Sequence, residues 1–187
     1  MDSITLGSAD ALHIHTVDNN EMNNDRDVYF EQTPSGLRTD LILAGGCAEP
    51  VAQFANGRPL IVSADSSVVE WSADFCHACS PREIPIVLAW NGSRYTVETK
   101  RYPNFSRVAA RNAWYKAAQC IRNDKLGDYG AHTYIAGYYA NMLTIGEGRF
   151  AYRWLMRRIP SSTKSWLREY APEFRRKVSC PCFGATA

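Results

Sequence analysis

The periodicity of the apolar residues changes at Pro103, and this change constrains the fold more than any other feature of the sequence. In residues 37–102, short apolar runs stand between turn residues, a pattern typical of strands. After Pro103, apolar residues recur at the three- and four-residue spacing of helices. Strands first and helices later predict an α+β fold with an antiparallel β-sheet or sandwich-like core and helices segregated to the C-terminal half.

A β-hairpin in residues 86–98 is the clearest local prediction. The Asn-Gly pair at 91–92 favours the positive φ angles of a tight hairpin turn. After this turn, Tyr95, Val97 and Thr99 alternate with polar residues, as in a strand with one buried face.

Helical periodicity predicts a series of helices after Pro103. The apolar spacing and the residues that end it place them at residues 106–123, 128–144, 149–158 and 162–170. Ser106 is the expected N-cap of the first helix, because its hydroxyl can accept a hydrogen bond from a free backbone N–H. Pro172 is expected to end the last helix, because proline lacks the N–H that a helix interior needs.

The N-terminal residues 1–36 are rich in Asp and Asn and poor in apolar residues. They are predicted to form an extended arm, with a short strand at 12–17. The remainder divides into a β-rich core at 37–102 and a basic helical part at 103–187. With 187 residues the chain has the length of one domain, so a single domain is expected.

The sequence predicts a cytoplasmic protein with no membrane partner. It has no apolar run of the ~20 residues that a membrane-spanning helix needs. Its N-terminus also lacks the basic and apolar segments of a signal peptide. Its six cysteines are therefore expected to be thiols, because the cytosol is reducing.

Catalytic and cofactor motifs are not recognisable in the sequence, so we expect a protein that is not an enzyme and binds no cofactor or metal. The glycines at 146–148 follow a predicted helix rather than a strand, which is not the geometry of a phosphate-binding loop. A cysteine nucleophile would need an adjacent base, and neither His77 nor His132 lies in a recognisable catalytic setting.

Two close cysteine pairs leave a different chemistry open. Cys76 and Cys79 form a C-x-x-C motif, and Cys180 and Cys182 form a C-x-C motif. Four thiolates could complete a tetrahedral zinc site. A zinc or thiol protein centred on Cys76 and Cys79 is therefore an alternative hypothesis.

Charge is divided between the two ends of the chain. Residues 1–40 contain eight acidic and two basic residues, a net charge of −6. Residues 149–177 contain nine basic and two acidic residues, a net charge of +7. Regions of opposite charge attract each other, so the acidic end of one copy is expected to dock on the basic end of another.

Residues 85–102, with the sequence PIVLAWNGSRYTVETKRY, resemble a segment of the polyhedrins of insect viruses. The shared features are an apolar strand, a Trp-x-Gly turn and a return strand that carries Tyr, Glu and Thr. The resemblance implies a sheet core with helices and an arm that reaches into neighbouring molecules. It also implies a viral occlusion-body matrix protein, which forms a lattice in the cytoplasm of an infected cell with virions as cargo.

These observations together predict a self-assembling structural protein whose main partner is itself. Ten tyrosines and five tryptophans add aromatic surface of the kind that interfaces favour. The predicted assembly contacts are acidic residues of the arm, tyrosines beside turns or charges, and C-terminal arginines. They are Asp18, Glu21, Asp25, Asp27, Tyr29, Tyr102, Tyr129, Arg149, Arg153, Arg157, Arg158 and Tyr170.

An RNA-binding module is the second alternative. Its cations would be Arg149, Arg153, Arg157, Arg158 and Arg168, and Tyr152, Trp154, Trp166 and Tyr170 could stack on bases. A segment that contains Tyr139, Asn141, Gly148, Arg149, Phe150 and Arg153 resembles the repeating backbone subunit of type I-F CRISPR surveillance complexes. That resemblance implies binding of a guide RNA.

Overall fold

The computed structural model describes the backbone of residues 2–6, 9–16, 26–33, 36–43, 47–55, 58–65, 84–91, 95–127, 130–178 and 183–184. Side chains are described in residues 60–63, 84–91, 95–127 and 130–178. The chain divides into two compact units. The sheet unit comprises residues 1–64, 86–98 and 182–187, and the helical unit comprises residues 65–85 and 99–181.

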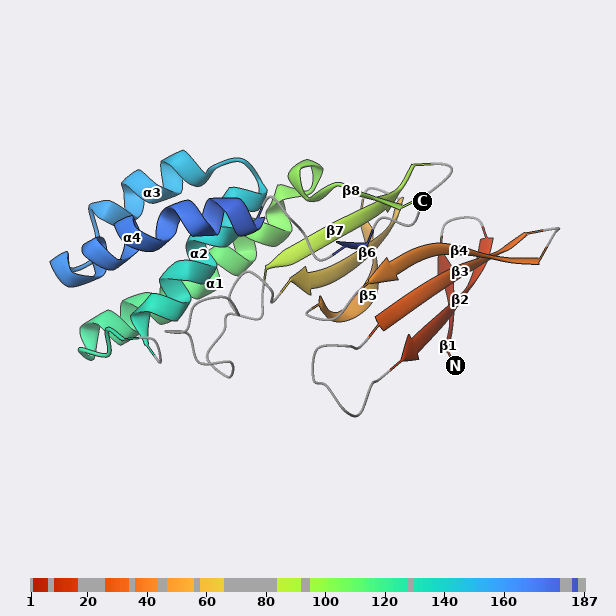
Figure 1. Ribbon diagram of the computed structural model, residues 1–187, viewed down its shortest axis with the longest axis horizontal. Coiled ribbons are helices and arrows are strands. Elements are labelled where there is room, and N and C mark those ends of the chain that lie inside the picture. Colours follow the sequence, from red (N-terminus) through yellow and green to blue (C-terminus); the bar gives the residue numbers. More distant parts are fainter. Residues whose placement is uncertain are drawn as a thin grey trace. The chain divides into compact units, whose positions relative to one another are not determined.

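The first sheet of the sheet unit has the strand order β1-β2-β3-β4-β9 (Figure 1). Its strands are β1 (Asp2–Leu6), β2 (Ala9–Thr16), β3 (Arg26–Thr33), β4 (Gly36–Leu43) and β9 (Phe183–Gly184). Each neighbouring pair is antiparallel.

The N-terminal 43 residues contain more strand than the sequence predicted. The expected short strand at 12–17 corresponds to β2, and β1, β3 and β4 accompany it. The register explains why this region forms a sheet, because it sets Leu12 opposite Phe30 and Ile14 opposite Val28. Apolar residues at every second position of both strands therefore share one face, although the segment as a whole is polar.

The second sheet has the strand order β5-β6-β7-β8, with β5 at Cys47–Ala55, β6 at Arg58–Asp65, β7 at Pro85–Trp90 and β8 at Tyr95–Val97. The predicted hairpin is confirmed, since β7 and β8 pair antiparallel with Trp90 opposite Tyr95. This register leaves residues 91–94 as the connection, which is longer than the predicted two-residue turn. Val97 is 48% exposed, so the predicted burial of its face of the strand is wrong at this position.

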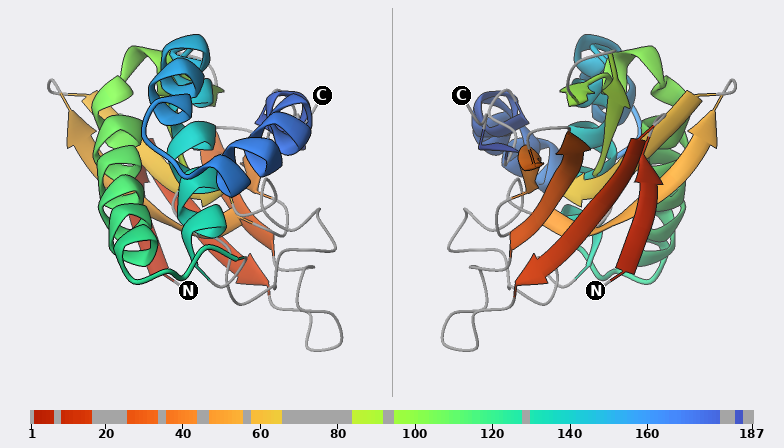
Figure 2. Two further views of the ribbon diagram at one scale, coloured as in Figure 1. Left: turned by 90° about the vertical axis from the view of Figure 1, so that its left-hand side faces the viewer. Right: turned by 90° about the vertical axis from the view of Figure 1, so that its right-hand side faces the viewer.

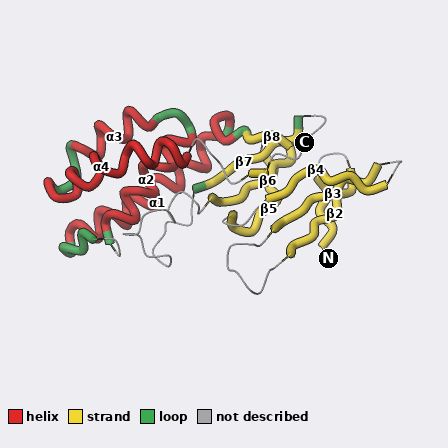
Figure 3. Tube along the Cα trace, in the orientation of Figure 1, coloured by secondary structure: helices red, strands yellow, loops and turns green. Residues whose placement is uncertain are grey.

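The helices follow β1 to β8 in sequence, and Figure 3 shows the helices in red and the strands in yellow. The predicted α+β class is confirmed. After the short 3₁₀ helix η2 (Thr99–Arg101) come α1 (Pro103–Arg122), α2 (Ala131–Thr144), α3 (Gly148–Met156) and α4 (Ser161–Val178). Within the described residues, no helix combines the length and the apolar character needed to cross a bilayer.

Helix α2 forms the centre of the helical unit. It packs against α1, α3 and α4, and the left view of Figure 2 shows it among them. Ten of its 14 residues are buried, which leaves it almost no solvent-facing side. The face of α1 in the same core is made of small residues, among them Ala110, Ala113 and Ala117. Small side chains at a helix contact permit a short interaxial distance.

Two helix ends differ from the prediction. Helix α1 begins at Pro103, and proline suits the first turn because its missing N–H would have had no helical partner there. Ser106 is therefore not the N-cap; it is buried, and its hydroxyl oxygen lies 3.1 Å from that of Thr144. Helix α4 continues through Pro172 to Val178, because Phe174 beyond the proline is fully buried and offsets part of the cost of the lost hydrogen bond.

Candidate basic interface of the helical unit

Positive charge is concentrated in the helical segment. Residues 99–178 contain sixteen Lys and Arg and five Asp and Glu, a net charge of +11. The remainder of the chain contains five basic and fourteen acidic residues, a net charge of −9. Helices α1 and α3 contain no acidic residue at all. The division of charge seen in the sequence is therefore a division between the helices and the rest of the chain.

Three arginines of α3 and its C-terminus lie on one exposed face. Arg149, Arg153 and Arg157 follow one another at four-residue intervals, and such residues are neighbours on a helix surface. All three are exposed, and no described carboxylate lies within ion-pair distance of them. Phe150 lies beside them on α3 and is 56% exposed. The face therefore combines an apolar ring with cations that no described carboxylate neutralises.

Arg158, the fourth predicted arginine, has a different environment from its neighbour Arg157. Its guanidinium carbon lies 4.1 Å from the centroid of the Trp154 ring, and its Nη1 donates a hydrogen bond of 3.4 Å to the Trp154 carbonyl oxygen. A cation–π contact at an exposed site contributes about 0.5–1 kcal/mol. Arg158 thus stabilises the end of α3 as well as adding to its charge.

An aromatic cluster joins α1, α2 and α3 through Trp114, Tyr138 and Trp154. The Trp154 ring centroid lies 4.6 Å from that of Trp114 and 5.2 Å from that of Tyr138. Burial raises the pKa of the Tyr138 hydroxyl above its usual value; the Arg158 charge opposes this shift, and the Glu147 charge adds to it. The cluster therefore connects three helices, and Tyr138 stacks on the Trp154 ring.

A second aromatic cluster joins α2, α3 and α4. Trp166 stacks on His132 with centroids 4.2 Å apart and planes inclined by 7°. The remaining close ring pairs are Trp166 with Tyr170, Trp166 with Phe174, Tyr139 with Phe174, and Tyr139 with Tyr152. Arg175 binds to the edge of this cluster, where its Nε donates a 2.9 Å hydrogen bond to the hydroxyl of the buried Tyr139.

The aromatic residues that were expected to stack on RNA belong to these two clusters. Tyr152, Trp154, Trp166 and Tyr170 are half-buried, and each packs against other rings of the helical unit. Among the described tyrosines of the helical segment, Tyr115 on α1 is the exposed one, at 62%.

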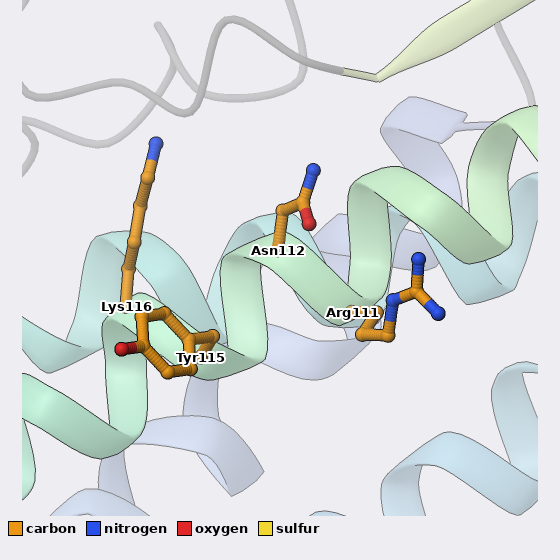
Figure 4. A pocket seen from close by; sticks show the side chains of 4 residues that line it. All are labelled: Arg111, Asn112, Tyr115 and Lys116. Carbon is orange, nitrogen blue, oxygen red and sulfur yellow. The ribbon is translucent and has the colours of Figure 1, made fainter.

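Tyr115 belongs to a group on the outer face of α1 that the sequence analysis missed. Arg111, Asn112, Tyr115 and Lys116 line a depression of about 370 Å³ (Figure 4). Arg111 and Tyr115 are four residues apart on a helix without acidic residues, and this spacing was the signal available in the sequence. The apolar periodicity of α1 predicts its buried face, so it did not identify this exposed group.

The other predicted contact residues are placed as follows. Asp18, Glu21, Asp25 and Tyr129 lie outside the described residues. Asp27 and Tyr29 are in β3, opposite Leu43 and Leu41 of β4, and their side chains are not described. Tyr102 precedes α1 and Tyr170 lies in α4; both are half-buried. Of the predicted set, the structure brings together Arg149, Arg153, Arg157 and Arg158.

The cysteine motifs of the zinc hypothesis, at 76–79 and 180–182, lie outside the described residues. Among the residues that are described, no group of three or more His, Cys, Asp or Glu side chains could hold a metal ion. The described Cys120 is a free, half-buried thiol on α1. The zinc hypothesis therefore stays a prediction.

Comparison of the chain with models of protein families, with curated proteins and with solved structures found no match. The resemblances to polyhedrins and to the CRISPR backbone subunit stay predictions. A function for the chain is therefore inferred from the charges and contacts of its own residues.

Proposed function

We propose that the protein is a structural protein that assembles with copies of itself, by contact between the basic helices of one copy and the acidic N-terminal region of the next. The observation that carries this proposal is the exposed row Arg149, Arg153 and Arg157. Within the described part of the chain, these arginines have no carboxylate partner. A carboxylate from a second copy would supply the missing counter-charge.

The contact joins two different surfaces, and this determines what it builds. A head-to-tail contact between unlike surfaces leaves a free basic surface and a free acidic surface on every open assembly. If the rotation between copies does not close a ring, the assembly grows as an open filament or lattice. The proposed role is thus structural and needs no catalytic group.

Charge alone would hold such a contact weakly. An exposed ion pair contributes about 0.2–1 kcal/mol, so three pairs supply at most about 3 kcal/mol. Burial of an aromatic side chain contributes about 1.5–3 kcal/mol, and Phe150 is exposed beside the arginine row. We therefore infer that the arginines orient the two copies. Burial of Phe150 would contribute about as much binding energy as the three ion pairs.

The polyhedrin resemblance extends the proposal to the kind of assembly. It points to a viral occlusion-body matrix protein, whose lattice would form in the cytoplasm of an infected cell and enclose virions. The size and regularity of the particles that the purified protein forms would test this extension separately from the contact itself.

A charge-reversal experiment on the full chain tests the contact. Replacing Arg149, Arg153 and Arg157 by Glu is expected to leave a monomer in sedimentation velocity at neutral pH. Replacing Asp18, Glu21 and Asp25 by Lys is expected to do the same. Mixing the two variants sets each reversed site opposite a site of the other charge, so assembly is expected to return only in the mixture.

The matched control reverses three charges elsewhere on the helices, with Arg111, Lys116 and Arg122 of α1 replaced by Glu. This variant has the same net charge as the α3 variant and is expected to assemble like the unmodified chain. Equal loss of assembly in both variants would assign the effect to overall charge. A monomeric unmodified chain at low salt would overturn the proposal.

A further inference from the structure

We propose that the outer face of α1 is a binding site for single-stranded nucleic acid, formed by Arg111, Asn112, Tyr115 and Lys116. This inference is independent of the proposed self-assembly, because it rests on a different helix and on different side chains.

The four residues form a continuous patch. Residues four positions apart are neighbours on a helix surface, so Tyr115 lies next to Arg111 and Lys116 next to Asn112. Figure 4 shows the four side chains along one stretch of α1, where they line a depression of about 370 Å³. The patch thus places two cations, an amide and an aromatic ring within the span of a few nucleotides.

Tyr115 is the aromatic ring that the patch offers to a base. It is 62% exposed, whereas its neighbour Trp114 packs on Tyr138 and Trp154 inside the helical unit. The exposed ring is therefore free to accept a stacked base. Stacking of one base on an aromatic side chain changes affinity by about 5- to 150-fold, and it requires a base face that a duplex keeps covered.

The cations of the patch suit a phosphate backbone. Arg111 has no ion pair with any described residue, and α1 contains no acidic residue that could repel a phosphate. Lys116 stands one residue from Tyr115, with its Nζ 5.7 Å from the centroid of the Tyr134 ring. The net charge of +11 in residues 99–178, from sixteen basic and five acidic residues, adds long-range attraction.

Asn112 and Tyr115 favour a nucleic acid over an acidic protein segment as the occupant. An acidic peptide would use the cations of the patch, but its carboxylates would not stack on the Tyr115 ring as a base does. The exposed amide of Asn112 offers both a donor and an acceptor, which matches the edge of an unpaired base. A base together with its phosphates engages all four side chains.

The experiment measures binding of the full chain to a fluorescently labelled oligo-dT of ~12 nucleotides by anisotropy, at salt concentrations from about 50 to 200 mM. Tyr115→Ala is expected to weaken binding by about 10-fold, whereas Tyr115→Phe retains the ring and should bind like the unmodified chain. A duplex of the same length is expected to bind more weakly than the single strand, with no dependence on Tyr115.

Arg107 provides a matched charge control on the same helix. Its Nη2 lies 2.6 Å from the Glu147 carboxylate, so this cation is already neutralised. Arg111→Gln and Arg107→Gln each remove one positive charge, but only Arg111→Gln is expected to weaken binding by several-fold and to reduce the salt slope by about 0.7. Helical circular dichroism checks that each variant is folded.

Three outcomes would overturn the inference. The first is unchanged affinity of Tyr115→Ala. The second is an equal loss in Arg107→Gln and Arg111→Gln, which would reduce the binding to general electrostatic attraction. The third is competition by a poly-glutamate peptide that depends on Tyr115, which would assign the patch to acidic protein segments. The α3 charge-reversal variant should keep its Tyr115-dependent binding whether or not the chain self-assembles.

Discussion

The inner and outer faces of the helical unit use the same residue types for opposite purposes. Inside, the buried Tyr139 hydroxyl accepts a hydrogen bond from the exposed Arg175, and the Phe174 ring is fully buried. Outside, Arg153 has no ion pair with a described residue, and the Phe150 ring is 56% exposed. Residue type alone does not separate a structural side chain from one available to a partner; its position relative to α2 does.

An exposed aromatic residue on the outer face indicates more about binding than a buried one does. A buried aromatic residue needs no explanation beyond the stability it confers. An aromatic residue exposed to solvent contributes little burial energy to the fold. When cations surround it, the arrangement suits an anionic partner with apolar surface. The faces of α1 and α3 both have this composition, whereas α2 carries no charged residue.

The largest difference between the faces should appear in the matched pair Phe174→Ala and Phe150→Ala. Phe174 is fully buried and contacts the Tyr139 and Trp166 rings, so its truncation leaves a cavity. We expect a loss of about 3–5 kcal/mol in the free energy of unfolding, measured in urea. Phe150→Ala should change it by less than about 0.5 kcal/mol. Equal losses would show that the Phe150 ring is part of the core.

A smaller difference should separate Tyr139→Phe from Tyr115→Phe, since each removes a single hydroxyl. The Tyr139 hydroxyl accepts a hydrogen bond from the Arg175 guanidinium, and we expect its removal to cost about 1–2 kcal/mol of unfolding free energy. Tyr115 is exposed and its hydroxyl is hydrated in both states, so the second variant should match the unmodified chain. A neutral Tyr139→Phe would mean that water replaces the hydrogen bond at no cost.

The order of strands and helices was predictable because it depends on local periodicity. Helix α2 is an example, since the apolar spacing predicted a helix at 128–144 and the helix spans Ala131–Thr144. In β2 and β3, however, the apolar residues are sparse, and Leu12 and Ile14 share a face with Phe30 and Val28 only when the strands are in register. Such cross-strand pairing is set by tertiary structure, and a scan along the chain does not show it.

The candidate sites were predictable only in part, for a similar reason. The arginine row of α3 follows from a four-residue spacing and was expected. The contrast between Arg157 and Arg158 was not, because adjacent residues point about 100° apart on a helix and only the second reaches the Trp154 ring. The α1 patch was missed because the apolar spacing that predicted a helix at 106–123 indicates its buried face and not its exposed one.

The smallest expected effect concerns Tyr138, which lies between the two faces and links the Trp114 and Trp154 rings to α2. Burial raises the pKa of its hydroxyl above the ordinary value of 10.0, with the Arg158 charge opposing the shift and the Glu147 charge adding to it. The folded protein therefore holds the Tyr138 proton more tightly than the unfolded chain does. This contribution to stability is fully present below pH 10.0 and declines as the pH rises from there through the raised pKa.

Tyr138→Phe removes this titration while it keeps the ring, so it isolates the contribution of the hydroxyl. Between pH ~8 and ~11, the free energy of unfolding of the unmodified chain should fall more than that of Tyr138→Phe. Parallel curves for Tyr138→Phe and the unmodified chain would show that the Tyr138 hydroxyl reaches solvent. Tyr138 would then belong to the outer face of the helical unit, although its ring contacts Trp114 and Trp154.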